Sequence, residues 1–415
     1  MKSNITNSDE LMAGLDITLI GYRDWIHAET AGVNVRDLHI ATHLAKQPGV
    51  GKVLFVNRPV SLAEMVVRCK RWRTKTGDVL YSGHNCQLSH MKEYGNLYVL
   101  SQFVPDIVTP LVSNRLWWNS IFQRKSVLKN IKLAKEYLTM TDDVLYLFSP
   151  LAISSIDTIP HKLFVHDVID NFAKHNRFSC KERNFVKQAY KRIGCDAGLV
   201  TCVSDLASEI FNDMPAKTVI IRNGVDRKWR EMTPPRPPEF NDVAGKIVGF
   251  GGYITDKLDT DFLISLAEMM PEVTFVIIGK AYDQAVLRAL RGKSNIKYLG
   301  FRRFEFIPSY YYHLDAALIL YKKEKNHDED PLKLYEYLSV GTPVVSLPLD
   351  MGGRKFNGMV KSEGNVCSFV DELLKFLDSD REKLRATCRA ALSESDFWDS
   401  KANFILESIH DQHSY

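Results

Sequence analysis

The sequence contains no cysteine pair of the C-x-x-C type, although seven cysteines are spread over its 415 residues. An odd number of cysteines, in a chain without a recognisable secretory signal, is typical of reduced thiols in the cytoplasm. The absence of paired spacing also argues against a structural zinc site. We therefore expect neither a disulfide framework nor a bound metal, and no cofactor.

Long apolar runs are missing as well. The first residues, MKSNITNSDELMAGLDITLIGY, lack the basic head and apolar core of a secretory signal. Nowhere do about 18 apolar residues follow one another, as a membrane span requires. The net charge is only +4, which is too small to indicate a polyanionic partner. We expect a cytoplasmic protein, or one that lies on the inner face of the cytoplasmic membrane without crossing it.

What the sequence does contain is two series of short apolar runs, each typical of buried parallel strands. Helical periodicity lies between several of them, and in residues 33–47 the apolar positions share one helical face. This alternation predicts an α/β fold with two Rossmann-like, doubly wound domains facing a cleft. The runs cover residues 16–21, 52–57, 143–149, 162–167, 197–204 and 217–224, then 246–252, 273–280, 295–301, 315–321 and 342–348.

Prolines separate the two series. Four of the five residues from 234 to 238 are proline, and because proline fixes φ and has no amide hydrogen, neither a helix nor a central strand can continue there. The predicted units are therefore a first domain over 1–232, a linker over 233–244, a second domain over 245–390, and a terminal helix over 391–415.

The stretch HDEDPLKLYEYLSVGTPVVS, residues 327–346, begins a helix with an unusual number of acids. Asp330 and Pro331 have the form of an N-cap and a first helical residue, and Gly341 closes the helix. An acidic first turn complements the helix dipole, which by itself is a sufficient explanation for Glu329. Asp328 and Glu336, however, lie eight positions apart.

This string resembles the donor-site signature of GT-B glycosyltransferases, in the retaining E-x7-E family (glycosyltransferase family 4-like, bacterial polysaccharide biosynthesis type). The resemblance implies that Asp328 contacts the donor sugar and that the helix start at Leu332 receives the diphosphate. It further implies that Glu336 holds the ribose hydroxyls. Amides at a helix start do bind anions, and a carboxylate can accept two hydroxyl bonds. The implied donor is a nucleotide diphosphate-sugar, and we expect a UDP-sugar.

Further segments carry the resemblance over most of the chain. Residues 203–226 resemble the family's closing segment of the acceptor-binding domain, and 249–280 resemble the first βαβ unit of its nucleotide-sugar-binding domain. The tail resembles a helix that crosses back to the first domain, with Trp398 as its anchor. Two departures stand out: the first acid is aspartate, and Tyr253 follows Gly252 where many members have arginine. Lys257 or Lys333 could supply the missing cation.

The first domain offers further candidates. Gly32 follows the first strand, where the family uses glycine near the donor phosphate, although any tight turn also favours glycine. Histidine and aspartate follow a buried strand in FVHDVIDNFAKH, residues 164–175. The resemblance assigns His166 to the donor sugar, and Asp170 is a general base if the enzyme inverts. Arg36 and His39 begin the first helix, with roles left open.

Two basic segments with tryptophan lie in the first domain. Residues 114–135 carry six basic residues and no acid, and residues 68–75 carry five around Trp72. Such helices lie on anionic membranes, which suits a lipid-linked saccharide acceptor. An equally common explanation is a helix docked on its own domain. No nucleic-acid motif accompanies the charge, so we expect no nucleic-acid partner.

The sequence thus predicts a glycosyltransferase that acts on a saccharide or lipid-linked saccharide in cell-envelope polysaccharide synthesis, retaining and metal-independent. Three alternatives stay open. The enzyme could invert, with Asp170 as the base; it could be an epimerase or hydrolase that consumes donor without an acceptor; or the chain could be a non-catalytic nucleotide-sugar-binding subunit.

Overall fold

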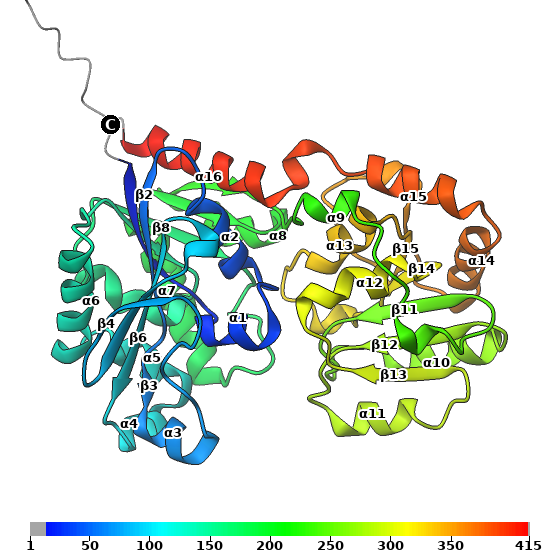
Figure 1. The fold of residues 1–415 in the computed structure, drawn as a ribbon, viewed down its shortest axis with the longest axis horizontal. Coiled ribbons are helices and arrows are strands. Elements are labelled where there is room, and N and C mark those ends of the chain that lie inside the picture. The colour runs from blue at the N-terminus through cyan, green and yellow to red at the C-terminus, as the bar shows by residue number, and fades with distance from the viewer. Residues whose placement is uncertain (1–13, 414–415) are drawn as a thin grey trace, which may run out of the picture.

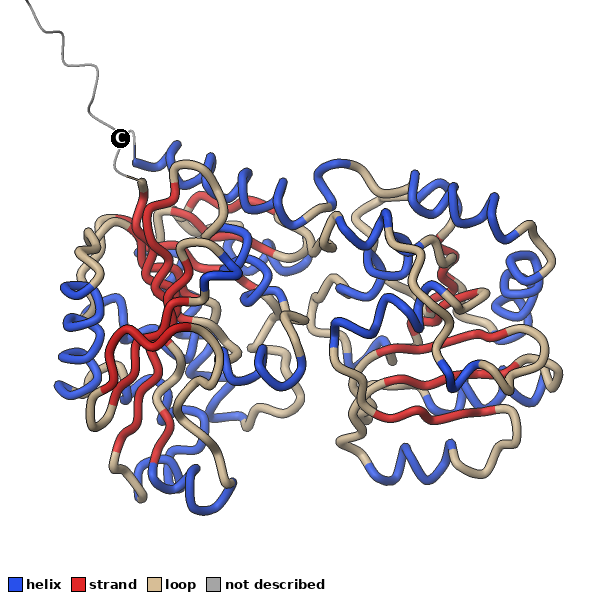
Figure 2. Tube along the Cα trace, in the orientation of Figure 1, coloured by secondary structure: helices blue, strands red, loops and turns tan. Residues whose placement is uncertain are grey.

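The computed structural model describes residues 14–413, with two α/β domains side by side (Figure 1). Figure 2 shows that the strands of each domain form one sheet with helices around it. Both sheets are built mainly of parallel strands joined through helices, as the alternating pattern predicts. The predicted fold class, two Rossmann-like domains, is confirmed.

The sheet of the first domain has the order β10-β9-β8-β7-β1-β2-β6-β5-β4, and β3 pairs with β6. All its neighbours run parallel except β4 with β5 and β5 with β6. Its strands are β1 (Leu15–Ile20), β2 (Val50–Val56), β3 (Val60–Ser61), β4 (Asp78–Ser82), β5 (Cys86–His90), β6 (Leu97–Val104), β7 (Val144–Leu147), β8 (Leu163–Val168), β9 (Leu199–Cys202) and β10 (Lys217–Ile220).

The sheet of the second domain is parallel throughout, in the order β13-β12-β11-β14-β15-β16. Its strands are β11 (Ile247–Gly251), β12 (Thr274–Ile278), β13 (Ile296–Gly300), β14 (Ala316–Ile319), β15 (Val344–Ser346) and β16 (Val360–Ser362). Each predicted strand run overlaps one of the observed strands. The strands β3 to β6 and β16 were not predicted.

Helices cover both sheets (Figure 2). In the first domain they are α1 (Trp25–Ala31), α2 (Arg36–Leu44), α3 (Leu62–Arg68), α4 (Val108–Ser113), α5 (Trp117–Ile121), α6 (Lys125–Tyr137), α7 (Cys180–Asp196) and α8 (Asp205–Ser208). On the second they are α9 (Lys228–Glu231), α10 (Thr260–Met269), α11 (Gln284–Leu290), α12 (Ile307–Tyr312), α13 (Leu332–Val340), α14 (Val366–Leu377) and α15 (Arg381–Ala390). None of the helices within residues 14–413 is both long and apolar enough to cross a bilayer.

The last helix, α16 (Trp398–His413), leaves the second domain and runs along the first (Figure 1). Trp398 is fully buried and stacks on the ring of His39, with ring centroids 4.9 Å apart. Ile405 and Ile409 join the apolar core that includes Leu38 of α2. Burial of these side chains ties the end of the chain to the first domain.

The proline-rich linker packs on the second domain. Phe240 is completely buried and meets the ring of Tyr310 edge-on, with centroids 5.7 Å apart. The hydroxyl of Ser309 donates to the carbonyl of Pro235. The linker is therefore held at several points along its length.

The basic segment 114–135 is not an amphipathic membrane helix. It breaks into α5 and α6, and the apolar residues expected to meet lipid are buried in the first domain, with Trp117 3% exposed and Phe122 not at all. Ile121 and Ile131 lie in the same core. The apolar face expected to contact lipid packs on the domain's own sheet, and the exposed side chains of the segment are polar or basic, among them Arg115, Gln123 and Lys129. This apolar face is therefore not available to a membrane in this structure.

Candidate active site

A cavity of about 310 Å³ lies between the two domains and is lined by both. The first domain contributes Arg23 after β1 and Asp170 after β8, and the second contributes Gly252 after β11 and Lys280 after β12. The start of α13 closes one wall. The carboxyl ends of the parallel strands of both sheets therefore meet at one cavity, which is where open α/β sheets bind ligands.

The helix α13 begins one residue later than predicted. Pro331 is its N-cap and no side chain caps it. The carboxylate of Asp330, expected to be the cap, instead accepts from the Asn223 amide at 2.7 Å and from the Tyr335 hydroxyl at 2.8 Å. Gly341 ends the helix at φ 91°, as predicted. The uncapped start, with Leu332 lining the cavity, is suited to an anionic ligand.

Lys333 provides a cation at this helix start. Its side chain is 8% exposed and lines the cavity. Its ammonium lies over the rings of Phe250 and Tyr321, at 4.3 and 4.5 Å from their centroids, and donates to the Tyr321 hydroxyl. No carboxylate among residues 14–413 lies within ion-pair distance of it. Burial lowers the pKa of Lys333 to about 7, so an incoming anion would restore its charge.

Gly252 makes room for that ammonium. Its φ is 143°, and a Cβ there would lie 2.5 Å from Nζ of Lys333. Gly279, at the end of the next strand, is equally constrained, because its Cβ would lie 1.8 Å from the carbonyl oxygen of Gly252. Both glycines line the cavity. Only glycine at these two positions leaves room for the Lys333 ammonium and for the close approach of the two strand ends.

Glu336 lies one turn further along α13 and also lines the cavity. It is 7% exposed, and no hydrogen bond to its carboxylate occurs within the described part of the chain. Burial raises the pKa of Glu336 to about 7, against the opposing effect of Lys333. A buried carboxylate without a partner is costly for the fold, and hydroxyl groups of a ligand would satisfy it.

The two lysines named as replacements for the missing arginine differ in position. Lys257 pairs with Glu329 and does not line the cavity, whereas Glu329 does. Lys333 lines it without a carboxylate partner, so the geometry favours Lys333. Lys280, which was not among the predicted site residues, lines the cavity too. Its position could have been predicted from the sequence, because it ends the apolar run 273–280 at the same sheet edge as Tyr253.

Asp328 lies elsewhere than expected. Its carboxylate accepts from Asn171 Nδ2 at 2.8 Å and from Lys174 Nζ at 2.9 Å, both in the first domain. It is absent from the cavity lining, and its φ is 63°. The expected position beside the donor sugar is therefore not found, because the first domain already occupies this carboxylate.

His166 is a core residue. It lies within β8, is completely buried and is absent from the cavity lining. No hydrogen-bond partner is present for either ring nitrogen in the described chain, and burial lowers its pKa to about 3. The neighbouring Asp167 pairs instead with Arg36, whose Nε lies 2.8 Å from Oδ1. The side chain of His166 is therefore buried in the core and does not line the cavity, and its contact with the donor sugar stays a prediction.

Asp170 does reach the cavity, but Gly32 does not. Asp170 is half-buried, and burial raises its pKa to about 6. Gly32, expected near the donor phosphate, ends α1 and faces Phe304 of the second domain, whose Cβ would lie 2.6 Å from an added Cβ. Asn34 and Arg36, just after it, line the cavity in its place.

One cluster of possible metal ligands lies within residues 14–413. The ligand atoms of His39, His43 and Asp226 all lie within 4.8 Å of one another. His43 Nε2 faces Asp226 Oδ1 at 3.1 Å. These residues line a different cavity, beside Trp229, and not the one between the strand ends. The absence of a metal requirement stays a prediction.

Sequence comparison relates the second domain to sugar transfer. Residues 246–379 match the family model described as "Glycosyl transferases group 1". TuaH of Bacillus subtilis, whose name assigns it to teichuronic acid biosynthesis as a glycosyltransferase, is 29% identical over 185 residues. This alignment covers 42% of the chain and 47% of TuaH. The chain thus spans about half the length of the curated relative it matches.

Solved structures match over the whole length. HepE from Anabaena, in complex with UDP, has a TM-score of 0.62 at 15% identity, covering 96% of this chain and 100% of its own. Sucrose-phosphate synthase from Thermosynechococcus elongatus has a TM-score of 0.67 at 12% identity, with 96% and 99% covered. The catalytic domain of starch synthase IV from Arabidopsis thaliana, bound to ADP and acarbose, has a TM-score of 0.65 at 12% identity. The match covers 97% of this chain and 100% of that domain.

The family model relates the second domain to the group 1 glycosyl transferases. The solved structures share the arrangement of two Rossmann-like domains, which is the GT-B architecture. At such low identities the solved structures establish the fold alone. The donor, the acceptor and the stereochemistry are therefore matters for proposal.

Proposed function

We propose that the protein transfers a sugar from a nucleotide diphosphate-sugar, a UDP-sugar, to a saccharide acceptor. The observation that carries this proposal is the start of α13 in the interdomain cavity. There an uncapped helix end, the unpaired ammonium of Lys333 and the unpartnered carboxylate of Glu336 line one cavity. The helix amides and Lys333 bind the diphosphate, and Glu336 accepts the ribose hydroxyls. UDP bound to the structurally similar HepE supports the choice of base.

The reaction proceeds mainly by positioning and by stabilising the departing diphosphate. The bond from the sugar's anomeric carbon to the phosphate oxygen breaks, and a bond to the acceptor hydroxyl oxygen forms on the same face. The hydroxyl proton passes to the departing phosphate oxygen. This route retains the anomeric configuration and needs neither a protein base nor a metal. EDTA is expected to leave the turnover unchanged.

Inversion with Asp170 as general base is the second candidate, and one observation favours it. Asp170 lines the cavity from the first domain, and burial raises its pKa to about 6, which suits proton acceptance near neutral pH. NMR of the product decides between the two routes. A product with the donor's anomeric configuration, together with retained turnover in Asp170→Asn, excludes the inverting route.

The acceptor we propose is a saccharide or lipid-linked saccharide of the cell envelope, in keeping with the name of TuaH. Peripheral contact with the cytoplasmic membrane would then pass through α3 and α4. Exposed apolar side chains gather there next to the basic segment 68–75, namely Val66, Val67, Val108, Leu111 and Val112. Such a surface suits the headgroup boundary of an anionic bilayer. Cosedimentation with anionic vesicles that Val67→Asp and Leu111→Asp leave unchanged would exclude this contact.

Thermal-shift measurements with UDP-, GDP- and ADP-sugars test the donor proposal. A ligand that binds the native state raises the melting temperature, and we expect the largest rise with a UDP-sugar. Glu336→Ala should abolish the rise, because the ribose loses its acceptor. If no nucleotide sugar raises the melting temperature, the proposal fails. Transfer to an acceptor, or its absence, then separates a transferase from a hydrolase, an epimerase or a non-catalytic binding subunit.

A further inference from the structure

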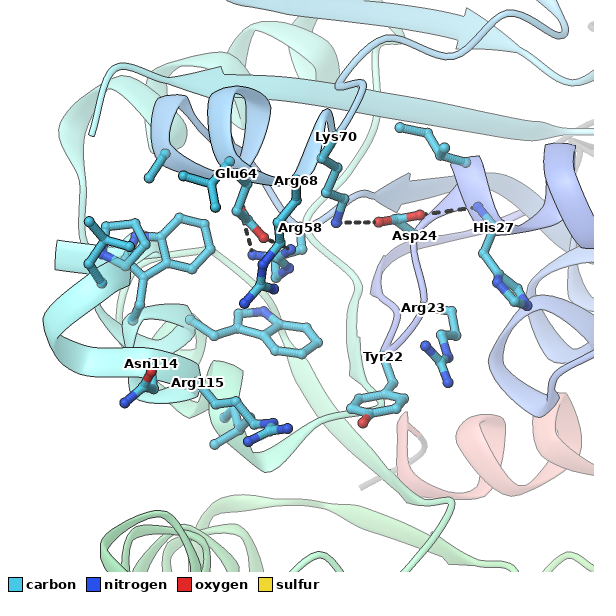
Figure 3. A pocket seen from close by; sticks show the side chains of 18 of the residues that line it. Tyr22, Arg23, Asp24, His27, Arg58, Glu64, Arg68, Lys70, Asn114 and Arg115 are labelled. Carbon is cyan, nitrogen blue, oxygen red and sulfur yellow. Dashed lines mark hydrogen bonds and ion pairs between the residues drawn. The ribbon is translucent and has the colours of Figure 1, made fainter. Parts of the chain in front are cut away.

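A second and larger cavity, of about 600 Å³, lies in the first domain. Tyr22 and Arg23 line both this cavity and the one between the domains, so the two adjoin at the end of β1. Figure 3 shows the second cavity from close by, with the side chains of α3 on one side and those of Asn114 and Arg115 on another. Its place beside the cleft is that of a second substrate.

Positive charge dominates this second cavity. Five cations line it against two carboxylates, and one histidine, His27, lines it as well. Burial and the neighbouring Arg23 lower the pKa of His27, so it is neutral at pH 7. The cations are Arg23, Arg58, Arg68, Lys70 and Arg115, and the carboxylates are Asp24 and Glu64.

Two of the cations are fixed in place by the two carboxylates (Figure 3). Arg58 forms a two-pronged pair with Glu64, at 2.6 and 3.2 Å, and its guanidinium lies 4.9 Å from the centroid of Trp117. Lys70 Nζ lies 2.8 Å from Asp24 Oδ2. Burial and the nearby Arg58 lower the pKa of Lys70. This repulsion between neighbouring cations would be relieved by an anion bound between them.

Two further cations are not paired with the carboxylates of the cavity. Arg68 is exposed and has no ion-pair partner anywhere in residues 14–413. Arg115 is 46% exposed and pairs at 3.5 Å with Glu182, which is outside the cavity lining. The charge of Arg68 is therefore unpaired, and that of Arg115 is shared with a residue outside the cavity.

Aromatic rings line the same space. Tyr22 and Trp118 stack with centroids 5.9 Å apart and planes 19° apart, and both line the cavity. Tyr22 also lines the cleft, next to Asp170. Aromatic side chains beside several cations suit a saccharide that bears a negative group, with the apolar parts of the sugar against the aromatic side chains and the anion against the guanidinium groups.

We propose that this cavity is the acceptor subsite and that the acceptor is an anionic saccharide, held through a carboxylate or phosphate group by Arg58, Arg68, Lys70 and Arg115. The inference rests on the proposed sugar transfer, and it restricts the acceptor to saccharides that carry a negative charge. Arg58 and Lys70 form the fixed part of the anion site, and Arg68 and Arg115 close on it. The shared chemistry is an oxyanion, and a uronic acid and a sugar phosphate are its two sources.

The test uses the full chain and three probes: methyl glucuronide, glucose 6-phosphate and the neutral methyl glucoside. Saturable binding is measured by isothermal titration in the presence of UDP. We expect the anionic probes to bind at least about tenfold more tightly than the neutral one, with affinity falling as salt rises. A preference for one anionic probe identifies the carboxylate or the phosphate source.

Arg68→Gln and Arg115→Gln should each weaken anionic binding about tenfold, leaving the melting temperature and UDP affinity unchanged. Arg73→Gln is the matched control, because it removes an exposed charge five residues from Arg68 outside the cavity lining. Equal affinity for all three probes, no saturable binding of any, or an equal effect of the control overturns the anionic subsite. If the wild-type chain does not bind UDP, the proposed donor site is contradicted instead. Failure of the donor site and failure of the anionic subsite are therefore distinguishable.

Discussion

Asn171 of the first domain donates a hydrogen bond to Asp328 of the second, with Nδ2 and Oδ2 2.8 Å apart, although 157 positions separate them in the sequence. Lys174 donates to the other carboxylate oxygen at 2.9 Å. The backbone amide of Asn171 also donates to the backbone carbonyl of His327 at 2.8 Å. A short segment after β8 is therefore fastened to the loop before α13, and Asp328 holds the two domains together beside the cleft.

Asp328→Ala should loosen this connection. It removes a charged acceptor from two donors, which lowers the free energy of unfolding by up to about 3 kcal/mol per bond. It also places alanine at a φ of 63°. Asparagine tolerates that φ, so Asp328→Asn should lose less unfolding free energy than Asp328→Ala. We expect a larger radius of gyration in solution scattering for Asp328→Ala without nucleotide, and weaker transfer. Asp378→Asn, at the exposed end of α14, is the control.

An unchanged radius of gyration in Asp328→Ala, with transfer abolished, would contradict the domain connection. That pair of results would instead support contact of Asp328 with the donor sugar, the role implied by the family resemblance.

Lys333→Met should separate phosphate binding from stability. Methionine retains the apolar contacts with Phe250 and Tyr321 and removes a buried cation that has no carboxylate partner. We expect UDP affinity to fall at least about tenfold and uridine affinity to stay unchanged, because only UDP carries the diphosphate. The melting temperature without ligand should not fall, since burial of the charge is costly.

Lys257→Met is the matched control for that experiment, since Lys257 pairs with Glu329 and does not line the cavity. A greater loss of UDP affinity in Lys257→Met than in Lys333→Met would reverse the assignment of the phosphate cation.

The fold follows from local patterns that the sequence displays openly. All eleven predicted strand runs overlap observed strands, because buried parallel strands read as continuous apolar runs. The missed strands have other patterns: β4 is mostly exposed, and β6 contains the buried polar residues Ser101 and Gln102, each of which accepts a hydrogen bond. Buried polar residues of this kind hide a strand from a search for apolar runs.

The site was harder to predict, because direction and tertiary pairing decide it. His166 lies within β8, whereas Asp170 lies two residues after its end. All six residues of β8 are buried, and the chain reaches the cleft only beyond the strand, at Ile169 and Asp170. The prediction therefore depended on where the strand ends. Asp328 pairs with Asn171 and Lys174 of the other domain, a contact that local sequence does not display, and its place at the donor sugar stays a prediction.

Glu336→Gln should give a pH-dependent gain in stability together with a loss of donor affinity. Burial raises the pKa of Glu336 to about 7 from 4.5, so between these values the native state binds more protons than the unfolded state. The stability that this group contributes is complete below pH 4.5 and is lost as pH rises through 7. Glutamine does not titrate, so the variant's advantage should grow over this range, to about 3 kcal/mol at most.

Urea unfolding at pH 5 and pH 8 measures this difference, and UDP titration at pH 8 measures the affinity, which should fall about tenfold or more. A structural role for Glu336 predicts the reverse, a less stable variant with unchanged UDP affinity.

His166→Leu should leave transfer almost unchanged. The ring is completely buried in β8, meets Tyr190 edge-on at 6.1 Å and has no hydrogen-bond partner for either nitrogen within residues 14–413. Replacing an unsatisfied buried polar ring by an apolar side chain is neutral or stabilising, so we expect an equal or higher melting temperature and turnover within about twofold of wild type. Glu336→Gln, whose residue lines the cleft, serves as the comparison, because its loss of donor affinity should lower turnover. Loss of turnover in His166→Leu at wild-type stability would instead support contact of His166 with the donor sugar.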